Sequence, residues 1–298
     1  MADPRESGAS CTQCGGGGYV VERMVGATAR ARRCGCQARC PRCGETGYTL
    51  VHAGDSRVAQ ICACRHLDQR IDIFNRVGIP AALATACFQN FKTWTPEQAR
   101  AKEAAEDFAR KFRPDQPMRG LLLHGKPGCG KTHLLAAILR YLALEKGVAG
   151  RYAEFMLVLS DIRAGFNSNR GHMEILGPLL DVPILAIDEL GKERGTEWER
   201  SMLDELISRR YNAGLTTLFA TNYPIHPERI PTRPGAMVDT RSPEWQREAE
   251  TMSLGERVGQ RSFSRLNEMC VFHEVRGKDY RALGIKEDAG ADDPPFWR

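Results

Sequence analysis

Three short apolar runs mark the middle of the chain, and each one ends in polar residues. The runs are GLLLH at 120–124, VPILAIDE at 182–189 and TTLFATN at 216–222. Segments of this length with few charges are typical of strands that are buried on both faces of a sheet. A helical spacing of apolar residues follows the first run, over KTHLLAAIL at 131–139. This alternation of strand and helix patterns predicts an α/β fold.

A further helix is predicted where capping signals precede an alanine-rich stretch. Thr95 is a candidate N-cap, Pro96 suits the first helical position, and Gln98 completes a capping box. We expect this helix to end near Phe112, because Pro114 follows and cannot continue it.

The first quarter of the chain contains two copies of a cysteine-rich unit. CTQCGGGGYVV begins at Cys11 and CPRCGETGYTL begins at Cys40, an offset of 40 − 11 = 29 residues. Each C-x-x-C pair is followed by glycine and, about twenty residues later, by C-x-C. Such a unit matches a tetrahedral all-cysteine zinc site in a knuckle whose amides face the thiolates. The predicted ligands are, for one zinc ion, Cys11, Cys14, Cys34 and Cys36, and for a second, Cys40, Cys43, Cys62 and Cys64.

Disulfides are the alternative for these cysteines. The amino terminus, MADPRESGAS, lacks the apolar segment of a signal peptide, so the spacing favours metal over disulfides. The remaining cysteines lie outside both units and are interpreted as small apolar residues of the core: Cys87, Cys129 and Cys270.

Composition narrows the class of protein. With 298 residues, of which 42% are hydrophobic, the chain is long enough for one large domain and one small one. No apolar run is long enough to cross a bilayer, which predicts a soluble, cytoplasmic protein without a membrane partner. The net charge is only +5, and residues 1–70 hold ten Arg, no Lys and six acidic residues, or 10 − 6 = +4. Zinc thiolates balance much of that charge, so the cysteine units are predicted to bind either a protein or a nucleic acid.

The most specific motif is GLLLHGKPGCGKTHLLAAIL, which places G-x-x-x-x-G-K-[ST] between the first strand and the helix after it. A glycine-rich loop in this context turns backbone amides inward to hold phosphates at a helix N-terminus. Lys131 is expected to neutralise the β- and γ-phosphates of ATP, and Thr132 to hold Mg2+. The predicted nucleotide contacts are Gly125, Lys126, Pro127, Gly128, Cys129, Gly130, Lys131 and Thr132.

The second apolar run ends in two carboxylates, and the third ends in an amide. Asp188 is expected to bind Mg2+, and Glu189 to activate the attacking water. Thr221 and Asn222 end the third run, where a polar side chain can reach the γ-phosphate or the water. Asn222 can also be interpreted as a turn residue that ends the strand. Together with the glycine-rich loop, these residues predict an ATPase.

Two segments carry a family resemblance. IDELGKERGTEWERSMLDELISRRYNAGLTTLFATNY and GQRSFSRLNEMCVFHEVRGKDYR resemble the DnaC-type helicase loaders and the related IstB-type transposition ATPases, both AAA+ proteins. The resemblance covers about residues 70–282. It implies an AAA+ P-loop core, with a parallel five-stranded sheet between helices and ATP at the strand ends. It also implies an oligomer that acts on DNA, in which an arginine from the next subunit completes each ATPase site.

The resemblance assigns roles to individual residues. The carboxylates for metal and water fall on Asp188 and Glu189, and the polar sensor falls on Asn222. The arginine of the SRL triplet is Arg265, and Arg261 is the alternative. A cation at this place stabilises charge that develops on the γ-phosphate. An ordinary surface arginine on a helix is the other interpretation of either residue.

Contact with single-stranded DNA is predicted for RYAEFMLVLSDIRAGFNSNRGHM, residues 151–173. The segment combines cations with a stacking surface, and the resemblance implies that it faces the central channel of the assembly. The alternative is an amphipathic helix with Phe155 and Leu159 in the core. The side chains expected to contact DNA are Arg163, Phe166, Asn167 and Arg170.

The sequence divides into a small module and a large domain. Residues 224–256 are rich in proline and charge, which predicts an exposed loop inside the large domain. The predicted segments are a tandem four-cysteine zinc module at 1–68, a joining segment at 69–95, the AAA+ domain at 96–284 and a disordered tail at 285–298.

Three functions are compatible with these features. The first is a helicase loader in DNA replication, whose zinc module binds a replicative helicase. The second is an IstB-like transposition helper, which binds a transposase and duplex DNA. The third is a nucleotide-gated DNA-binding scaffold with little turnover, which Glu189 and Arg265 disfavour because both suit hydrolysis.

Overall fold

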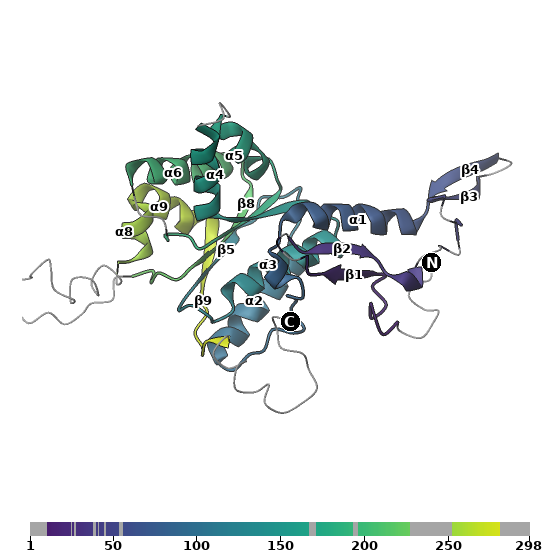
Figure 1. Cartoon of the computed structure of the whole chain (residues 1–298), viewed down its shortest axis with the longest axis horizontal. Coiled ribbons are helices and arrows are strands. Elements are labelled where there is room, and N and C mark those ends of the chain that lie inside the picture. Colours follow the sequence, from purple (N-terminus) through teal and green to yellow (C-terminus); the bar gives the residue numbers. More distant parts are fainter. Residues whose placement is uncertain are drawn as a thin grey trace, which may run out of the picture.

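The computed structural model describes residues 11–280, except for residues 25, 27, 38–39, 41, 45, 54–55, 167–170, 193–195 and 227–251. Two antiparallel hairpins at the amino end precede a larger α/β domain, and helix α1 (Ala63–Val77) joins the two parts (Figure 1). The expected tail at 285–298 lies outside the described residues. None of the helices in the described part of the chain is both long and apolar enough to span a membrane.

A five-stranded parallel sheet forms the centre of the larger domain. Its strands are β5 (Gly120–His124), β6 (Gly150–Glu154), β7 (Ile184–Asp188), β8 (Thr216–Thr221) and β9 (Cys270–Glu274). They lie in the order β6-β7-β8-β5-β9, and every neighbouring pair is parallel. The three apolar runs form β5, β7 and β8, which are neighbours in the middle of the sheet. The predicted α/β fold with a parallel five-stranded sheet is therefore confirmed.

Helices cover both faces of this sheet (Figure 1). One face shares a core with α1, α2 (Pro96–Lys111) and α3 (Lys131–Leu144). The other face shares a core with α4 (Phe155–Phe166), α5 (His172–Leu180), α6 (Glu197–Asn212), α8 (Leu254–Val258) and α9 (Gln260–Met269). The domain thus consists of three layers, which is the arrangement that a parallel sheet needs to bury both of its faces.

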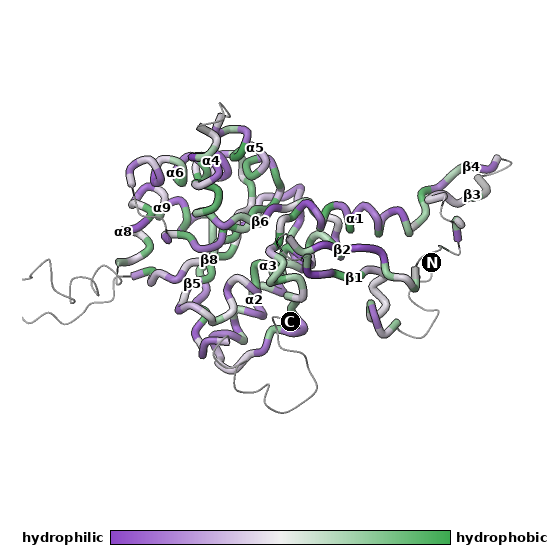
Figure 2. The backbone as a smooth tube through the Cα atoms, viewed as in Figure 1, coloured by the Kyte–Doolittle hydropathy of each residue, from purple (hydrophilic) through white to green (hydrophobic). Residues whose placement is uncertain are grey.

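The two cores follow from the alternation of side chains along each strand. In β5, Leu121 packs in the core with α3, and the next residue, Leu122, packs in the core on the opposite face. Figure 2 shows hydrophobic stretches gathered in the sheet and in the helices that cover it. Of the cysteines outside the zinc units, Cys129 and Cys270 are buried in these cores as predicted, whereas Cys87 is only partly buried.

Helix α2 begins and ends close to its predicted limits. The Thr95 hydroxyl accepts a hydrogen bond from the backbone N–H of Gln98 at 3.2 Å, and Phe112 is the C-cap. The reciprocal bond of the predicted capping box differs. The Gln98 side-chain oxygen accepts from the backbone N–H of Trp94 at 3.0 Å, one residue before the N-cap. This bond ties the start of the helix to the segment that precedes it.

The two hairpins at the amino end are packed differently. Their strands are β1 (Tyr19–Glu22) with β2 (Arg30–Arg33), and β3 (Tyr48–Ala53) with β4 (Ser56–Ile61). The first hairpin lies against α1, where the Asn75 side chain accepts from the Ala31 N–H at 2.7 Å and donates to the Ala31 carbonyl at 3.0 Å. Asn75 therefore pairs with β2 much as a neighbouring strand would. The second hairpin projects from the far end of α1 (Figure 1).

Helix α1 occupies part of the segment that the sequence predicts as a joining segment, 69–95. Phe74 and Val77 of this helix are buried in the core shared with α3. Gly78 ends the helix with a φ of 83°, a left-handed conformation that favours glycine. Phe91, further along, is also buried. This segment is packed into the core, which its mixed composition did not reveal.

The end of the predicted loop at 224–256 is helical. Residues 227–251 lie outside the described part of the chain, and α8 follows shortly after them. The Ser253 hydroxyl accepts from the Glu256 N–H at 3.4 Å, and the Glu256 carboxylate accepts from the Ser253 N–H at 2.7 Å. Leu254 is fully buried. The prediction of an exposed loop is therefore wrong for these last residues, because it overlooked their S-x-x-E capping box.

Candidate nucleotide-binding site and zinc sites

The P-loop, residues 125–130, connects the carboxyl end of β5 to α3. Lys131 is the first residue of α3, and its side chain is buried. Its ammonium group donates to the carbonyl of Gly125 at 2.7 Å and to that of Lys126 at 2.8 Å. Thr132 follows in the same helical turn and is partly exposed. The cation is thus held inside the loop that the motif predicts to bind phosphates.

Two glycines of this loop are needed because other segments approach it closely. A Cβ atom on Gly125 would lie 2.4 Å from the carbonyl oxygen of Val275, and one on Gly130 would lie 2.5 Å from the Phe91 ring. Both glycines also have positive φ values, 140° and 98°. A larger residue at either position would displace the loop from the segments that support it.

The segment that follows β9 supports the outer side of the P-loop. The Val275 N–H donates to the His124 carbonyl at 2.7 Å, and the Tyr280 N–H donates to the Gly128 carbonyl at 3.1 Å. The Tyr280 ring lies 5.8 Å from the Phe91 ring. Motif reasoning did not connect these residues with the P-loop. The available signal was the family resemblance, which extended through this segment.

Asp188 is buried at the carboxyl end of β7, which is the end of the sheet where the P-loop also begins. One of its carboxylate oxygens accepts from the Tyr152 hydroxyl at 2.7 Å, and the other accepts from the Glu189 N–H at 2.9 Å. Burial and the charge of Asp188 raise the pKa of Tyr152, so this hydroxyl keeps its proton and remains a donor. Tyr152, on the neighbouring strand β6, was missed by sequence reasoning because it belongs to no motif. These bonds fix the orientation of the Asp188 carboxylate.

Glu189 has an unusual backbone conformation, with a φ of 56°. The left-handed region is uncommon for residues other than glycine and is enriched at functional sites. The Glu189 carboxylate forms an ion pair with the Lys192 ammonium group. Burial and the neighbouring Glu189 raise the pKa of Glu154, the last residue of β6. The candidate base therefore lies between a cation and a second acidic side chain.

Asn222 follows β8, which lies between β7 and β5. Its exposed position is therefore adjacent both to the strand that ends in Asp188 and to the strand that leads into the P-loop. Thr221 is buried instead, and its hydroxyl donates to the Leu190 carbonyl at 2.7 Å. Thr221 thus stabilises the chain after β7. Asn222 is the polar side chain that is exposed at the carboxyl end of β8.

Arg265 and Arg261 of α9 both contact Asp204 of α6. The Arg265 Nη1 atom lies 3.1 Å from Asp204 Oδ1, and the Arg261 Nε atom lies 3.7 Å from Asp204 Oδ2. The Arg265 side chain is 20% exposed and that of Arg261 is 74% exposed, so Arg265 is the more restrained of the two. Both belong to the helical layer on the opposite face of the sheet from α3.

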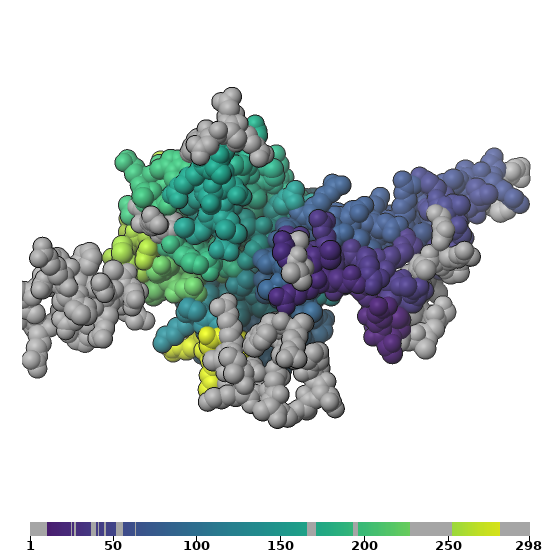
Figure 3. Space-filling model, in the orientation of Figure 1, coloured from purple at the N-terminus to yellow at the C-terminus, as the bar shows by residue number. Residues whose placement is uncertain are grey.

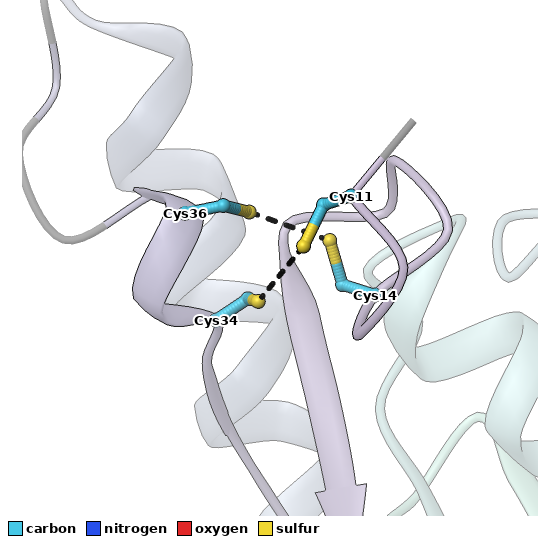
Figure 4. A group of neighbouring side chains, drawn as sticks. All are labelled: Cys11, Cys14, Cys34 and Cys36. Carbon is cyan, nitrogen blue, oxygen red and sulfur yellow. Dashed lines mark hydrogen bonds between the residues drawn. The ribbon is translucent and has the colours of Figure 1, made fainter. Parts of the chain in front are cut away.

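The eight predicted zinc ligands form two separate groups of four, as expected from the repeat. Within each group the Sγ atoms lie within 4.8 Å of one another. In the first group, Cys11 and Cys34 are 3.9 Å apart and Cys14 and Cys36 are 3.4 Å apart (Figure 4). The matching distances in the second group are 3.7 Å and 3.4 Å. Thiolates about 2.3 Å from a tetrahedral zinc ion are about 3.8 Å apart, so both groups fit zinc.

Within each group the thiols divide into two kinds. Contacts with neighbouring thiols raise the pKa of Cys36 to about 12, burial and such contacts raise the pKa of Cys64 to about 12, and their partners are biased toward ionisation. Burial alone would raise the pKa of Cys14, but hydrogen bonds from the Gly18 amide and the Cys36 thiol outweigh it and lower the pKa of Cys14 to about 7. Equivalent contacts lower the pKa of Cys43 to about 6. The thiolate is the form that binds zinc, so the knuckles favour metal binding. The four Sγ atoms of each group lie within 4.8 Å of one another, which favours a shared metal ion over disulfides.

Comparison with known proteins places this geometry in a family. A protein-family profile described as IstB-like ATP binding protein matches residues 83–227. The replicative helicase loader DnaC of Escherichia coli strain K12 is 29% identical over 150 residues, which are 50% of this chain and 60% of that protein. The crystal structure of the DnaC helicase loader matches with a TM-score of 0.53 and 26% identity, over 65% of this chain and 98% of that one. The chain contains an IstB/DnaC-type ATP-binding domain.

A further structure shares the fold of the IstB/DnaC-type domain. The crystal structure of DnaI matches with a TM-score of 0.50 and 23% identity, over 67% of this chain and 93% of that one. The P-loop, Asp188, Glu189 and Asn222 all lie inside the profile match, whereas Arg265 and the zinc ligands lie outside it. The match to DnaC of Escherichia coli spans 60% of the length of that protein. The five-stranded parallel sheet of this chain matches an AAA+ P-loop fold.

The segment of the IstB/DnaC-type domain that was predicted to contact DNA is built mainly as a core helix. Phe155 and Leu159 of α4 are buried, which confirms the amphipathic alternative. Arg163 is 2.5 Å from the buried carboxylate of Glu199, and its guanidinium carbon is 4.8 Å from the Trp198 ring centroid. Glu199 of α6 orients Arg163, whose side chain is still 48% exposed, so contact of Arg163 with DNA stays a prediction. The Phe166 side chain, Asn167 and Arg170 lie outside the described residues.

Proposed function

We propose that this protein is an ATP-hydrolysing helicase loader of the DnaC type. It would assemble as an oligomer on single-stranded DNA in the cytoplasm and deliver a replicative helicase that its zinc module binds. One observation carries the proposal. At the carboxyl ends of three adjacent strands, the structure brings together Lys131, Asp188, Glu189 and Asn222. Parallel sheets bind ligands at the carboxyl ends of their strands. The match of this domain to DnaC supports the choice of function.

The residues at the carboxyl ends of these strands have distinct roles in the proposal. The amides of the P-loop and the Lys131 ammonium would bind the phosphates of ATP. Thr132 and Asp188 offer the hard oxygen ligands that suit Mg2+, which supplies positive charge against the β- and γ-phosphate oxygens. Tyr152 would keep the Asp188 carboxylate oriented, because its hydroxyl donates to it at 2.7 Å.

Glu189 would accept a proton from the attacking water, and Asn222 would orient that water or the γ-phosphate. A carboxylate can act as a base only when its lone pairs are available. The ion pair with Lys192 engages Oε2 and lowers the basicity of this carboxylate. Opening of the pair would strengthen the base, which offers a point at which binding of DNA or a partner could control hydrolysis.

Arg265 would complete the ATPase site of the neighbouring subunit in the oligomer. It lies in the helical layer across the sheet from α3, the helix that begins at Lys131. This position supports action on a neighbour rather than on the same chain. A guanidinium there would stabilise the charge that develops on the γ-phosphate. Arg261 is the weaker candidate, because its contact with Asp204 is longer and its side chain is more exposed.

A second function, an IstB-like transposition helper, is supported by the description of the matching profile. It would use the same ATPase chemistry with a transposase and duplex DNA. The DnaC relative and the DnaC crystal structure favour the helicase loader. A scaffold with little turnover is disfavoured, because Glu189 retains the carboxylate that hydrolysis needs.

Phosphate release by the purified full-length chain tests the proposal. We expect turnover that single-stranded DNA stimulates, together with co-sedimentation of the chain and the host replicative helicase. The Glu189→Gln variant is the control, and it should bind ATP without turnover. Stimulation only by duplex DNA and a transposase would instead support the transposition helper. ATP binding without any release would support the scaffold.

A further inference from the structure

The second four-cysteine unit carries an apolar face on its hairpin. Tyr48, Leu50 and Ile61 are 44%, 68% and 49% exposed. Tyr48 pairs with Ile61, and Leu50 pairs with Ala59, so these four residues lie on one side of the hairpin. We call them the hairpin face. Val58 is 43% exposed but belongs to the opposite side.

The equivalent hairpin of the first unit is packed against the larger domain. Ala31 of β2 is buried and bonded to Asn75 of α1. The Tyr19 hydroxyl donates to the Glu145 carboxylate, at the end of α3, at 2.8 Å. One copy of the repeat is therefore fixed to the ATP-binding domain, and the other extends away from it, as Figures 1 and 3 show. The two copies therefore differ in what their hairpins contact: the first packs against the domain, and the second presents its hairpin outward.

The base of the hairpin is tied to the second four-cysteine group and to α1. The Cys62 N–H donates to the Gly47 carbonyl at 2.9 Å, which ties the end of β4 to the start of β3. Cys64, a ligand of the second zinc group, lies in the first turn of α1. The Arg33 side chain donates to the Cys64 carbonyl at 3.3 Å and pairs with Asp68. A surface whose base is anchored in this way loses less conformational entropy when it binds a partner than a free hairpin would.

Among the residues that the structure describes, the charged side chains at the two ends of the hairpin face are arginines. β3 and β4 contain no Asp or Glu. The Arg65 guanidinium carbon lies 4.7 Å from the Tyr48 ring centroid, and Arg65 donates to the Tyr48 hydroxyl at the base of the hairpin. Arg57, in register with His52 on the same side as Leu50, lies toward the tip. The face is therefore an apolar strip with an arginine at each end.

We propose that the hairpin face docks an apolar segment of another protein, such as one side of an amphipathic helix, flanked by carboxylates. An exposed apolar strip on a two-stranded hairpin is unfavourable unless a partner covers it. The arginines at its two ends favour a partner segment that carries acidic residues on either side of its apolar part. A second copy of this chain fits less well, because two such faces would bring arginine against arginine. A nucleic acid also fits less well, because Tyr48 is the one residue of the face that offers a stacking surface, and Leu50, Ala59 and Ile61 offer neither charge nor stacking. The inference rests on the proposed partner-docking role of the zinc module.

The test measures binding of the full-length chain to the purified host replicative helicase. Leu50→Asp and Ile61→Asp should each weaken binding at least about tenfold, because a carboxylate would replace an apolar contact and face acidic flanks. Val58→Asp is the matched control on the other side of the hairpin, and its affinity should stay within about twofold of wild type. Each variant should keep the wild-type zinc content and phosphate release, which shows that it has folded.

Several outcomes would overturn this inference. The inference fails if the wild-type chain does not bind the helicase, or if Leu50→Asp binds the helicase with wild-type affinity. It also fails if Val58→Asp lowers the affinity for the helicase as much as Leu50→Asp does. A change in self-association or in DNA affinity with Leu50→Asp, at unchanged helicase affinity, would assign the face to a second copy or to nucleic acid. If the wild-type chain releases no phosphate but Leu50→Asp still loses the helicase, the ATPase proposal fails and the docking surface stands.

Discussion

Arg265 of α9 donates a hydrogen bond to Asp204 of α6, with 3.1 Å between Nη1 and Oδ1. The same carboxylate oxygen accepts from the Ser262 hydroxyl at 3.2 Å. The Arg265 guanidinium also lies 6.0 Å from the centroid of the Tyr211 ring. These contacts within one chain limit the orientations of Arg265. An arginine ordered in this way can stabilise developing charge with little further reorganisation.

We predict that Asp204→Asn lowers the ATP turnover of the assembled protein about three- to tenfold while leaving ATP affinity unchanged, because Arg265 loses the charge that orients it. Steady-state phosphate release, separated into kcat and KM, is the measurement. Glu205→Gln is a matched control, since Glu205 lies on the same helix but pairs with Arg209 at 2.8 Å. A wild-type kcat in Asp204→Asn, or an equal loss in both variants, would contradict the positioning role.

Lys131→Ala and Glu189→Gln should separate binding from chemistry. Removal of the Lys131 ammonium deletes a charge-assisted contact with phosphate, so ATP affinity should fall at least about tenfold and turnover should vanish. Glu189→Gln should keep ATP affinity and lower turnover by about a hundredfold or more, because the base is lost. Fluorescent-nucleotide titration and phosphate release distinguish the two effects. Unchanged affinity and turnover in Lys131→Ala would remove the P-loop interpretation.

Elemental analysis should find two zinc ions per chain, and the two should differ in their effect on stability. Cys34→Ser should lose one zinc ion and lower the melting temperature of the ATP-binding domain, because the first unit packs against α1 and α3. Cys62→Ser should also lose one zinc ion but destabilise that domain less, because its hairpin is exposed. A single zinc ion in the wild type would refute the tandem arrangement.

Asn75→Ala should loosen the first hairpin from α1. The side chain makes two hydrogen bonds to the backbone of Ala31, at 2.7 Å and 3.0 Å. Their loss should cost about 1–3 kcal/mol of unfolding free energy, because the Ala31 backbone groups lose their partners in a partly buried place. Denaturant unfolding measures the change. Asn90→Ala offers a comparison, since Asn90 also bonds two backbone groups, at Cys87 and Thr85, but on the exposed surface.

Sequence reasoning found the features that are local. The apolar runs gave the central strands, the G-x-x-x-x-G-K-T spacing gave the loop between β5 and α3, and the cysteine spacing gave the two groups of four thiols. These features depend on residues a few positions apart or on a repeated spacing, so a pattern is enough to find them.

Features that depend on distant partners were missed. Tyr152 acquires its role only because parallel pairing brings β6 beside β7, and no motif marks it. The ion pair of Arg163 with Glu199, a capping-box residue of α6, joins two helices and was not foreseen either. The Val275 bond to the carbonyl of His124 joins residues far apart in the chain. A single sequence holds no signal for such contacts, because they arise only when the layers assemble.

Mixing of two inactive variants tests most directly the central claim, that Arg265 completes the ATPase site of a neighbouring subunit. Arg265→Ala alone should bind ATP normally but hydrolyse it slowly, because the arginine acts on transition-state charge. Oligomers that combine Arg265→Ala with Lys131→Ala contain junctions that join an intact P-loop to an intact arginine. We predict that phosphate release partly returns in the mixture, although neither parent releases phosphate well. If the mixture stays inactive while sedimentation shows that the two variants assemble together, Arg265 does not act across the subunit junction.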